Sequence, residues 1–397
     1  LIVFAIIFGF FVYRKGAPLS VATIVGVIAL VVCLAIGLNF HPIYLNGTTW
    51  MYIIGVYILI ASIAPVWILL QPRDYLSSFL LYGMMIVAVV GVLGAGVMGQ
   101  NLNMEIPAFT GFTDELSSLG TMFPALFVTI ACGAISGFHS LVGSGTTAKQ
   151  LDNEKDARPI AYGGMLIECA LALISLCAVG YIWQEYVGGL RTPTTVFATG
   201  LSRMVATIPG LAASESTVKA LLILAVSAFC LTSLDTATRL ARYMFQEFWL
   251  EPGQTPKDIQ GGFKKLMVNP FFATIITVIL GILLGMNGFT KIWGLFGAAN
   301  QLLAGIGLLA VAAWLGNAGK NNKMFLFPMT FMLIVTICSL ALTIRNQLGI
   351  IARGAADWGP YAQAGIGTLL ILLAIVLAVE GYQTVAHPRR DVEVTAE

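Results

Sequence analysis

The chain is 397 residues long, with 58% hydrophobic and only 10% charged residues and a formal net charge of +2. A soluble domain carries about 25% charged residues, so this composition excludes an ordinary soluble protein. The chain has no basic stripe, and we therefore expect no nucleic-acid partner. The six cysteines stand singly in apolar segments, without a C-x-x-C pair, and predict neither a disulfide framework nor a metal site.

Apolar runs near the ~20 residues needed to cross a bilayer follow one another along the whole chain, and barrel-type alternation is absent. We predict an all-α polytopic membrane protein with about 11 transmembrane helices. The predicted segments are 1–13 (incomplete), 19–38, 49–70, 75–98, 121–142, 159–183, 218–240, 268–287, 290–315, 324–343 and 361–382.

Charge divides the connections between these segments into two sets. One set holds Arg14, Lys15, Arg73, Lys149, Lys155, Arg158, Arg239, Arg242, Lys257, Lys264, Lys265, Lys320, Lys323, Arg389 and Arg390. The other holds Arg191, Arg203, Lys219, Lys291, Arg345 and Arg353. The positive-inside rule makes the first set cytoplasmic. It predicts a cytoplasmic C-terminus, with the long loops 99–120 and 184–217 outside; within the second loop, 194–208 has the pattern of a re-entrant or surface helix.

The stretch 123–149 is apolar at first and then rich in small and polar residues. Ser136, His139 and Ser140 share one helical face, and Gly133 and Gly137 form a G-x-x-x-G pair nearby. One interpretation is close helix packing, because small residues let backbones approach. The other is a polar face along a substrate or ion path, with His139 as a proton carrier.

The segment 49–70 contains Ala64, Pro65 and Trp67. Proline removes a backbone donor and clashes with the preceding turn, so the helix should kink or unwind just before Pro65. A helix broken within a membrane exposes backbone groups that can bind carboxylates or ions. The alternatives are an ordinary proline kink and, for Trp67, an interfacial anchor.

Two carboxylates fall inside apolar segments, where an ionisable group is costly unless it is paired or neutral. Glu168 lies near the middle of its segment and could titrate or form a structural hydrogen bond. Asp235 precedes Arg239 by four residues, which predicts either a functional carboxylate or a local ion pair with Arg239. Asn300 and Gln301 favour helix–helix contact over ligand binding.

Five motifs together resemble the carbon starvation protein A (CstA) family. They are PVWILLQPRDYLSSFL (65–80), FVTIACGAISGFHSLVGSGTTAKQL (127–151), AYGGMLIE (161–168), LDTATRLARYMFQE (234–247) and LFGAANQLLAG (295–305). The family's N-terminal part, with its own Gly/Pro-broken helix, has no counterpart here. We therefore expect the chain to begin about where the family's first few membrane helices end.

The resemblance implies uptake of peptides or pyruvate across the bacterial inner membrane. It also implies a LeuT-like inverted-repeat core of the amino acid–polyamine–cation superfamily, incomplete at the N-terminus. The chain would be one transporter domain, 1–397, with 1–240 in the core, 268–382 as additional helices and 383–397 as a cytoplasmic tail. If the helices are counted along such a core, the resemblance implies that 49–70 is its sixth helix and 121–142 its eighth. The eighth commonly supplies hydroxyl ligands to a coupling ion, here Ser136 and Ser140.

We therefore predict a secondary active transporter coupled to H+ or Na+, not an enzyme, with membrane lipid and a small-molecule or peptide substrate as partners and no cofactor. The expected substrate-binding residues are Ala64, Pro65, Trp67, Gly133, Ser136 and His139. The expected ion-coupling residues are Ser136, Ser140, His139, Glu168 and Asp235. A sensor or receptor for the same solutes is an alternative. An intramembrane hydrolase using Ser136 or Ser140 with His139 is less favoured, because no G-x-S-x-G or H-E-x-x-H motif supports it.

Overall fold

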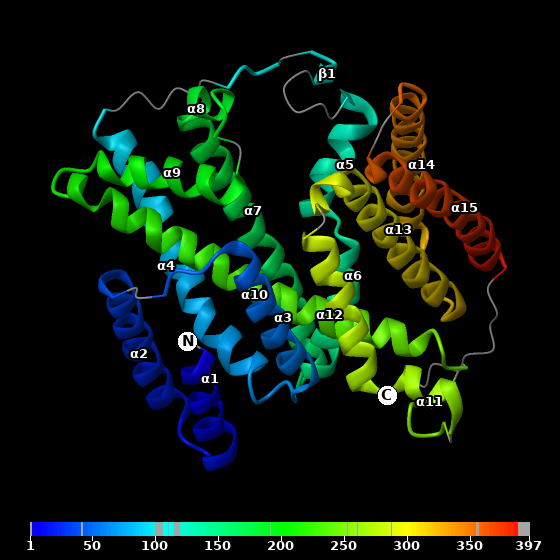
Figure 1. The fold of residues 1–397 in the computed structure, drawn as a ribbon, viewed down its shortest axis with the longest axis horizontal. Helices are drawn as coiled ribbons and strands as arrows, with labels where there is room; N and C mark the ends of the chain where they lie inside the picture. Colours follow the sequence, from blue (N-terminus) through cyan, green and yellow to red (C-terminus); the bar gives the residue numbers. More distant parts are fainter. Residues whose placement is uncertain are drawn as a thin grey trace. The chain divides into compact units, whose positions relative to one another are not determined.

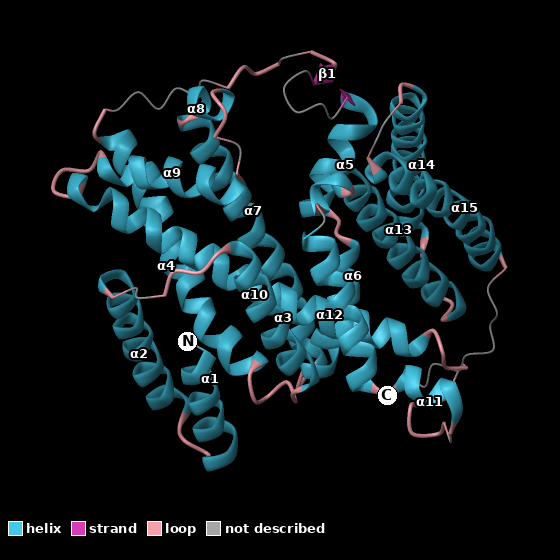
Figure 2. Ribbon diagram, viewed as in Figure 1, coloured by secondary structure: helices cyan, strands magenta, loops and turns pink. Residues whose placement is uncertain are grey.

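The computed structural model describes residues 2–40, 43–99, 106–109, 111–114, 120–190, 192–251, 253–259, 261–286, 288–354 and 357–387. These residues are mostly helical (Figure 2), with one short antiparallel pair, β1 (Thr113–Asp114) and β2 (Gly120–Thr121). The chain forms two compact units. Unit 1 comprises Leu1–Ala108 and Asp152–Leu283, and unit 2 comprises Phe109–Leu151 and Leu284–Glu397.

Unit 1 is an assembly of long apolar helices joined by short ones (Figure 1). Its α-helices are α1 (Ile2–Gly9), α2 (Leu19–Asn39), α3 (Gly47–Ile63), α4 (Leu70–Val97), α7 (Ala157–Tyr181), α8 (Trp183–Val187), α9 (Pro193–Ala206), α10 (Glu215–Glu247), α11 (Gly262–Val268) and α12 (Pro270–Met286). A π-helical segment, Phe10–Arg14, extends α1, and α12 ends at the boundary of the unit.

The core of unit 1 forms around α9, which contacts α4, α7 and α10. Ala198 and Leu201 of α9 are fully buried, as is Ala178 of α7. Gly200 lies directly against the backbone of Ala178, so that any side chain at this position would clash. The predicted outer loop 184–217 therefore contains a helix packed into the protein interior, and the helical interpretation of 194–208 is confirmed.

Unit 2 contains α5 (Met122–Ala134), α6 (Gly137–Val142), α13 (Trp293–Asn317), α14 (Lys323–Ala352) and α15 (Trp358–Ala386). α13, α14 and α15 pack against one another (Figure 1) through a core that includes Leu302, Met329 and Ala374. A second cluster, which includes Val128 of α5, attaches α5 to α13 and α14. Both clusters are apolar, as burial of side chains between helices requires.

Seven helices in the described residues are long and apolar enough to cross a membrane, or eight if α11 and α12, bent by 64°, form one span. Large apolar side chains such as Val25, Ile28 and Val32 of α2 are exposed, as expected of surfaces that face lipid. The prediction of an all-α polytopic membrane protein is thus confirmed. The remaining predicted segments coincide with the shorter helices α1 and α3 and with the interrupted pair α5–α6, so the count of eleven spans stays a prediction.

Candidate functional site

The helix α3 ends just before Pro65, as its sequence predicts. Ala64 leaves the helical conformation (φ −58°, ψ 145°), and α4 begins only at Leu70. Pro65 is exposed, whereas Trp67 is half-buried with the Arg14 guanidinium 4.7 Å from its ring centroid. The last carbonyls of a helix have no partner within it, so this break leaves acceptors that other groups must satisfy.

Two arginines of α10 satisfy those carbonyls. Arg239 Nη2 donates to the carbonyl oxygens of Ala61 and Ala64, at 2.9 and 2.8 Å, and Arg242 Nη1 donates to that of Ser62 at 3.0 Å. Both arginines are only 5% exposed. A cation at a helix C-terminus also interacts favourably with the helix dipole. The end of α3 is therefore a site for positive charge, which α10 supplies from within the protein.

A second set of buried charges lies beside this break. Asp235 of α10, 2% exposed, forms an ion pair with Arg73 of α4, which is 4% exposed. Tyr57 of α3 donates to Asp235 Oδ2 at 2.9 Å. Arg73 also binds Asp74 at 2.9 Å, and Asp74 accepts a hydrogen bond from Thr232 of α10 at 3.1 Å. Three helices, α3, α4 and α10, thus meet at one polar network.

The network corrects the local pairing considered for Asp235. Its ion partner is Arg73 on another helix, and Arg239, four residues along α10, instead donates to the end of α3. Sequence reasoning placed Arg73, Arg239 and Arg242 in cytoplasmic connections and missed Tyr57. The one local indication was the spacing of Asp235, Arg239 and Arg242, which lie on one face of a helix.

Several buried polar atoms at this site have no hydrogen-bond partner in the structure. They are Ser62 Oγ, Asp235 Oδ1, Arg239 Nε and Arg242 Nε. Three arginines also face two aspartates, so the cluster carries one excess positive charge when both carboxylates are ionised. Buried polar groups without partners are rare in rigid structural networks. Each such group in a native structure calls for an explanation, such as an ordered water or an ion beside it.

In unit 2 the stretch 123–149 is interrupted between α5 and α6. Ser136 lies in extended backbone at the start of α6, and its Oγ accepts from the His139 amide at 3.5 Å. Asn300 Oδ1 of α13 accepts from the Phe138 amide at 2.9 Å and from Ser136 Oγ at 3.3 Å. Asn300 thus joins two helices, in agreement with its interpretation as a helix–helix contact. A helix N-terminus needs such acceptors for its first amides.

The two glycines of the G-x-x-x-G pair have different environments. An atom added at Gly137 would clash with the backbone of α13 at Asn300 and Ala304, so Gly137 allows this close approach. Among the residues that the structure describes, Gly133 has no neighbour within 4 Å of such an atom. The close-packing interpretation therefore holds for Gly137 and not for Gly133.

The remaining expected site residues are distributed over both units. Ser140 Oγ donates to the Gly137 carbonyl at 2.7 Å, and His139 is exposed in unit 2. Glu168 is exposed midway along α7 of unit 1. Unit 1 thus brings Asp235 close to the break at Ala64, and unit 2 keeps Ser136, His139 and Ser140 together on one short stretch. In the described residues, no three His, Cys, Asp or Glu side chains converge as a metal site requires.

Membrane-length helices, two interruptions and a buried network of charges together define a polytopic membrane protein with ionisable groups inside its helical assembly. The sequence model of the family described as Carbon starvation protein CstA matches residues 1–196 and 184–339. The chain belongs to this family.

Curated relatives agree with this assignment. A "Peptide transporter CstA" of Bacillus subtilis (strain 168) is 29% identical over 93% of this chain and 66% of its own length. That of Escherichia coli (strain K12) is 33% identical over 73% of this chain and 48% of its own length. A "Pyruvate/proton symporter BtsT" of Escherichia coli (strain K12) is 43% identical over 37% of this chain and 20% of its own length. The chain spans about half to two thirds of the length of the peptide transporters it matches. No solved structure matches the chain.

Proposed function

We propose that this chain belongs to a secondary active transporter that imports short peptides or pyruvate across the bacterial inner membrane, coupled to H+ or Na+. Family membership supports the class of protein, and the names of the relatives support the two substrate classes. The single observation that carries the mechanism is the buried Asp235–Arg73 pair beside the break at Ala64. Charged groups inside a membrane protein are costly and usually mark ion pathways.

Asp235 is the group we assign to ion coupling in unit 1. One of its oxygens is bound by Arg73 and Tyr57, and the other is buried without a partner. Binding of a proton or Na+ at this carboxylate would weaken its attraction to Arg73, and the released guanidinium would favour a different packing of α4 against α10. A charge change at one residue would thus bias the equilibrium between two helix arrangements, which alternating access requires.

The substrate roles of Ala64, Pro65 and Trp67 follow from the same break. Arg239 satisfies the carbonyls that end α3. A substrate carboxylate accepts hydrogen bonds, so it would meet the amide groups that follow the break. Gly133, Ser136 and His139 are the residues we assign to the substrate path in unit 2. The further candidates for ion coupling are Ser136, His139 and Ser140 in unit 2 and Glu168 in unit 1.

The proposal includes the finer topology. Eleven spans would place the C-terminus and 383–397 in the cytoplasm. Residues 1–240 would belong to a LeuT-like inverted-repeat core, and 268–382 would add helices to one transporter domain. A cysteine introduced into the C-terminal tail tests the orientation, since only cytoplasmic thiols escape an impermeant reagent applied to intact cells.

The transport test uses full-length protein reconstituted in proteoliposomes. Labelled pyruvate or a labelled dipeptide should accumulate when a proton or sodium gradient is imposed, and not without one. Failure of both solutes to accumulate under either gradient contradicts the proposal. Binding with normal affinity but without accumulation would instead support the sensor alternative.

Two variants then test the assigned coupling residues. Asp235→Asn should abolish gradient-driven accumulation and leave exchange of substrate across the membrane. The neutral asparagine imitates only the protonated state of the carboxyl and cannot be ionised. Glu154→Gln, an exposed change in the same unit, is the matched control. His139→Ala tests the assignment in unit 2. If either variant shows coupled uptake and a pH dependence like those of the wild-type protein, the substituted residue contributes only to packing.

A further inference from the structure

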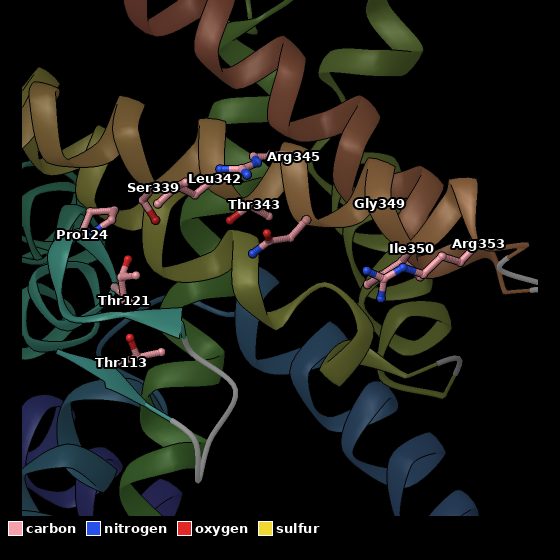
Figure 3. Close-up of a pocket in the computed structure, with 12 residues that line it drawn as sticks. Thr113, Thr121, Pro124, Ser339, Leu342, Thr343, Arg345, Gly349, Ile350 and Arg353 are labelled. Carbon is pink, nitrogen blue, oxygen red and sulfur yellow. The ribbon is translucent and has the colours of Figure 1, made fainter. Parts of the chain in front are cut away.

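Unit 2 contains a cavity of about 650 Å³, lined by polar and apolar side chains, between the β1–β2 pair, the start of α5 and the C-terminal half of α14 (Figure 3). Its polar lining includes Thr113, Thr121, Ser339, Thr343, Arg345 and Arg353. Figure 3 shows the threonines of the β1–β2 pair at one end of this part of α14 and Arg353 at the other. Small-molecule sites typically have volumes of about 300–1,000 Å³, so the cavity is large enough for a solute.

The α14 residues that line the cavity are spaced as one helical face. Ser339, Thr343, Asn346, Gly349 and Arg353 follow one another at intervals of three or four residues. The N-terminal half of α14 instead contributes Met329, Leu333 and other apolar side chains to the core. The polar face is therefore local to the C-terminal half of the helix, and a face of this kind needs water or a solute against it.

The charge of the cavity is positive. In the part of the chain that the structure describes, neither Arg345 nor Arg353 has an ion-pair partner. Two other basic residues on the predicted outer side are paired, Arg203 with Glu185 and Lys291 with Asp357. A guanidinium offers paired donors that match a carboxylate. The hydroxyl and amide groups that line the cavity add further hydrogen-bond donors for the carboxylate oxygens.

The cavity lies at a helix end that water can reach. α14 has 30 residues, which corresponds to about 45 Å at 1.5 Å per residue, and a hydrocarbon core is about 30 Å thick. One end of α14 must therefore project beyond the hydrocarbon. By the charge pattern, the end with Arg345 and Arg353 is the outer one.

We propose that this cavity is a binding site for the carboxylate of a small organic acid or of a short peptide, captured from the outer side. Its role in uptake rests on the proposed transport function, but its binding does not. One of the two arginines, Arg345 or Arg353, which lie about two turns apart on α14, binds the carboxylate, and the threonines and Asn346 line the rest of the cavity. In the described part of the chain, no atom lies within 4 Å of a Cβ added at Gly349, so a solute can reach the helix backbone there.

Equilibrium binding to the full-length protein in nanodiscs of zwitterionic lipid tests the site directly. Labelled pyruvate and labelled alanylalanine are the two probes, and whichever binds identifies the source of the carboxylate. We expect the joint change Arg345→Gln with Arg353→Gln to weaken binding at least tenfold. Lys219→Gln, which removes one charge elsewhere on the predicted outer side, should change it less than twofold. Unchanged binding in the arginine variant, or no binding of either probe by the native protein, overturns the proposal.

Competition experiments and a second variant test whether the arginine substitutions weaken binding only through a general change of charge or through misfolding. The C-terminal amide of alanylalanine, which lacks the carboxylate, should compete at least tenfold less well than the free acid. Gly349→Leu should block the cavity without touching either arginine. Gly365→Leu on α15, also in open space, is its control. Equal competition by the amide contradicts a carboxylate site, as does full binding by Gly349→Leu.

Uptake kinetics separate this site from the transport proposal. In proteoliposomes the arginine variant should raise KM at least tenfold with little change in the maximal rate, because capture precedes the membrane-crossing steps. Binding without any uptake by the native protein would end the transport proposal and leave the site intact. Uptake by the arginine variant with an unchanged KM would end the site proposal and leave transport intact.

Discussion

Asp235 and Arg73 form a buried ion pair although 162 residues separate them in the chain. The pair joins α10 to α4, and Tyr57 joins α3 to the same carboxylate. Removing one partner of such a pair leaves an unpaired buried charge, which is far more costly than replacing both partners with apolar residues. A variant that removes one partner and a variant that replaces both partners therefore distinguish a structural ion pair from a functional one.

An unpaired buried charge costs about 3–5 kcal/mol. We expect Asp235→Ala to lower the free energy of unfolding by less than this, because Arg73 stays buried but keeps Asp74 as an ion partner. The double variant Asp235→Leu with Arg73→Met removes both charges of the pair but also takes the ion partner from Asp74, so it should recover only part of that loss. Thermal unfolding in detergent measures both, with Glu154→Gln as an exposed acidic control. A double variant as unstable as Asp235→Ala would show that the charges themselves, and not their balance, hold the helices together. Partly recovered stability without recovered coupled uptake is the expected outcome.

Arg239 and Arg242 differ in the number of carbonyls they satisfy. Hydrogen bonds to charged groups contribute ~1.5–3 kcal/mol each, and Arg239 makes two such bonds to α3 where Arg242 makes one. Arg239→Gln should therefore destabilise the protein about twice as much as Arg242→Gln. Thermal unfolding gives the order, and Arg158→Gln, an exposed change on α7, is the control. The reverse order would mean that the contact of Arg242 with the Tyr243 ring matters more than the end of α3.

Gly137 and Gly133 provide a matched pair of substitutions on one stretch of chain. Gly137→Ala would force α6 away from α13 at Asn300, and overpacking of this kind usually costs about 1–3 kcal/mol. Gly133→Ala, in open space, should be neutral or stabilising by up to ~1 kcal/mol, since alanine favours a helix. Thermal unfolding of both variants provides the measurement. Equal effects would contradict the close contact between α6 and α13.

The start of α15 should carry a measurable acid dependence. Lys291 Nζ donates to Asp357 at 2.8 Å, and this hydrogen bond lowers the pKa of the Asp357 carboxyl below its ordinary value of about 4. A lowered pKa means that the contribution to stability is present above the ordinary value and disappears as the pH falls through the folded value. Asp357→Asn keeps an acceptor for the Trp358 amide, so helix capping should survive while the acid dependence shrinks.

Thermal unfolding of the native protein and of Asp357→Asn between pH 3 and pH 7 checks this expectation. The difference between the two should be largest at neutral pH and should narrow toward pH 3. A constant difference across that range would show that Lys291 does not distinguish the ionised from the neutral carboxyl.

The sequence predicted those features of the fold that depend on local chemistry. Proline cannot donate a hydrogen bond, and α3 ends at Ile63, just before Ala64 and Pro65. Each predicted apolar segment coincides with a helix or an interrupted pair of helices, because the bilayer requires apolar side chains and internally bonded backbone.

The features that it did not predict depend on partners distant in the chain. The interruption before α6 falls at Ser136, where neither proline nor a charge marks a break; Asn300, 164 residues away, supplies the acceptor that makes it stable. The partner of Asp235 is equally remote, and spacing rules for one helix cannot reveal it. The burial of Arg73 was likewise hidden, since the same charge at the end of a segment is typical of a cytoplasmic loop.

The short helix α9 has a consequence for how the chain is assembled. Its 14 residues correspond to about 21 Å, less than the thickness of the hydrocarbon core, so lipid alone cannot hold it in place. Its packing partners include α10, which is synthesised after it. We therefore expect α9 to wait at the membrane surface during translation and to enter the bundle only after α10 has inserted. A nascent chain halted before residue 215 should leave α9 open to protease, and one extended past residue 247 should protect it.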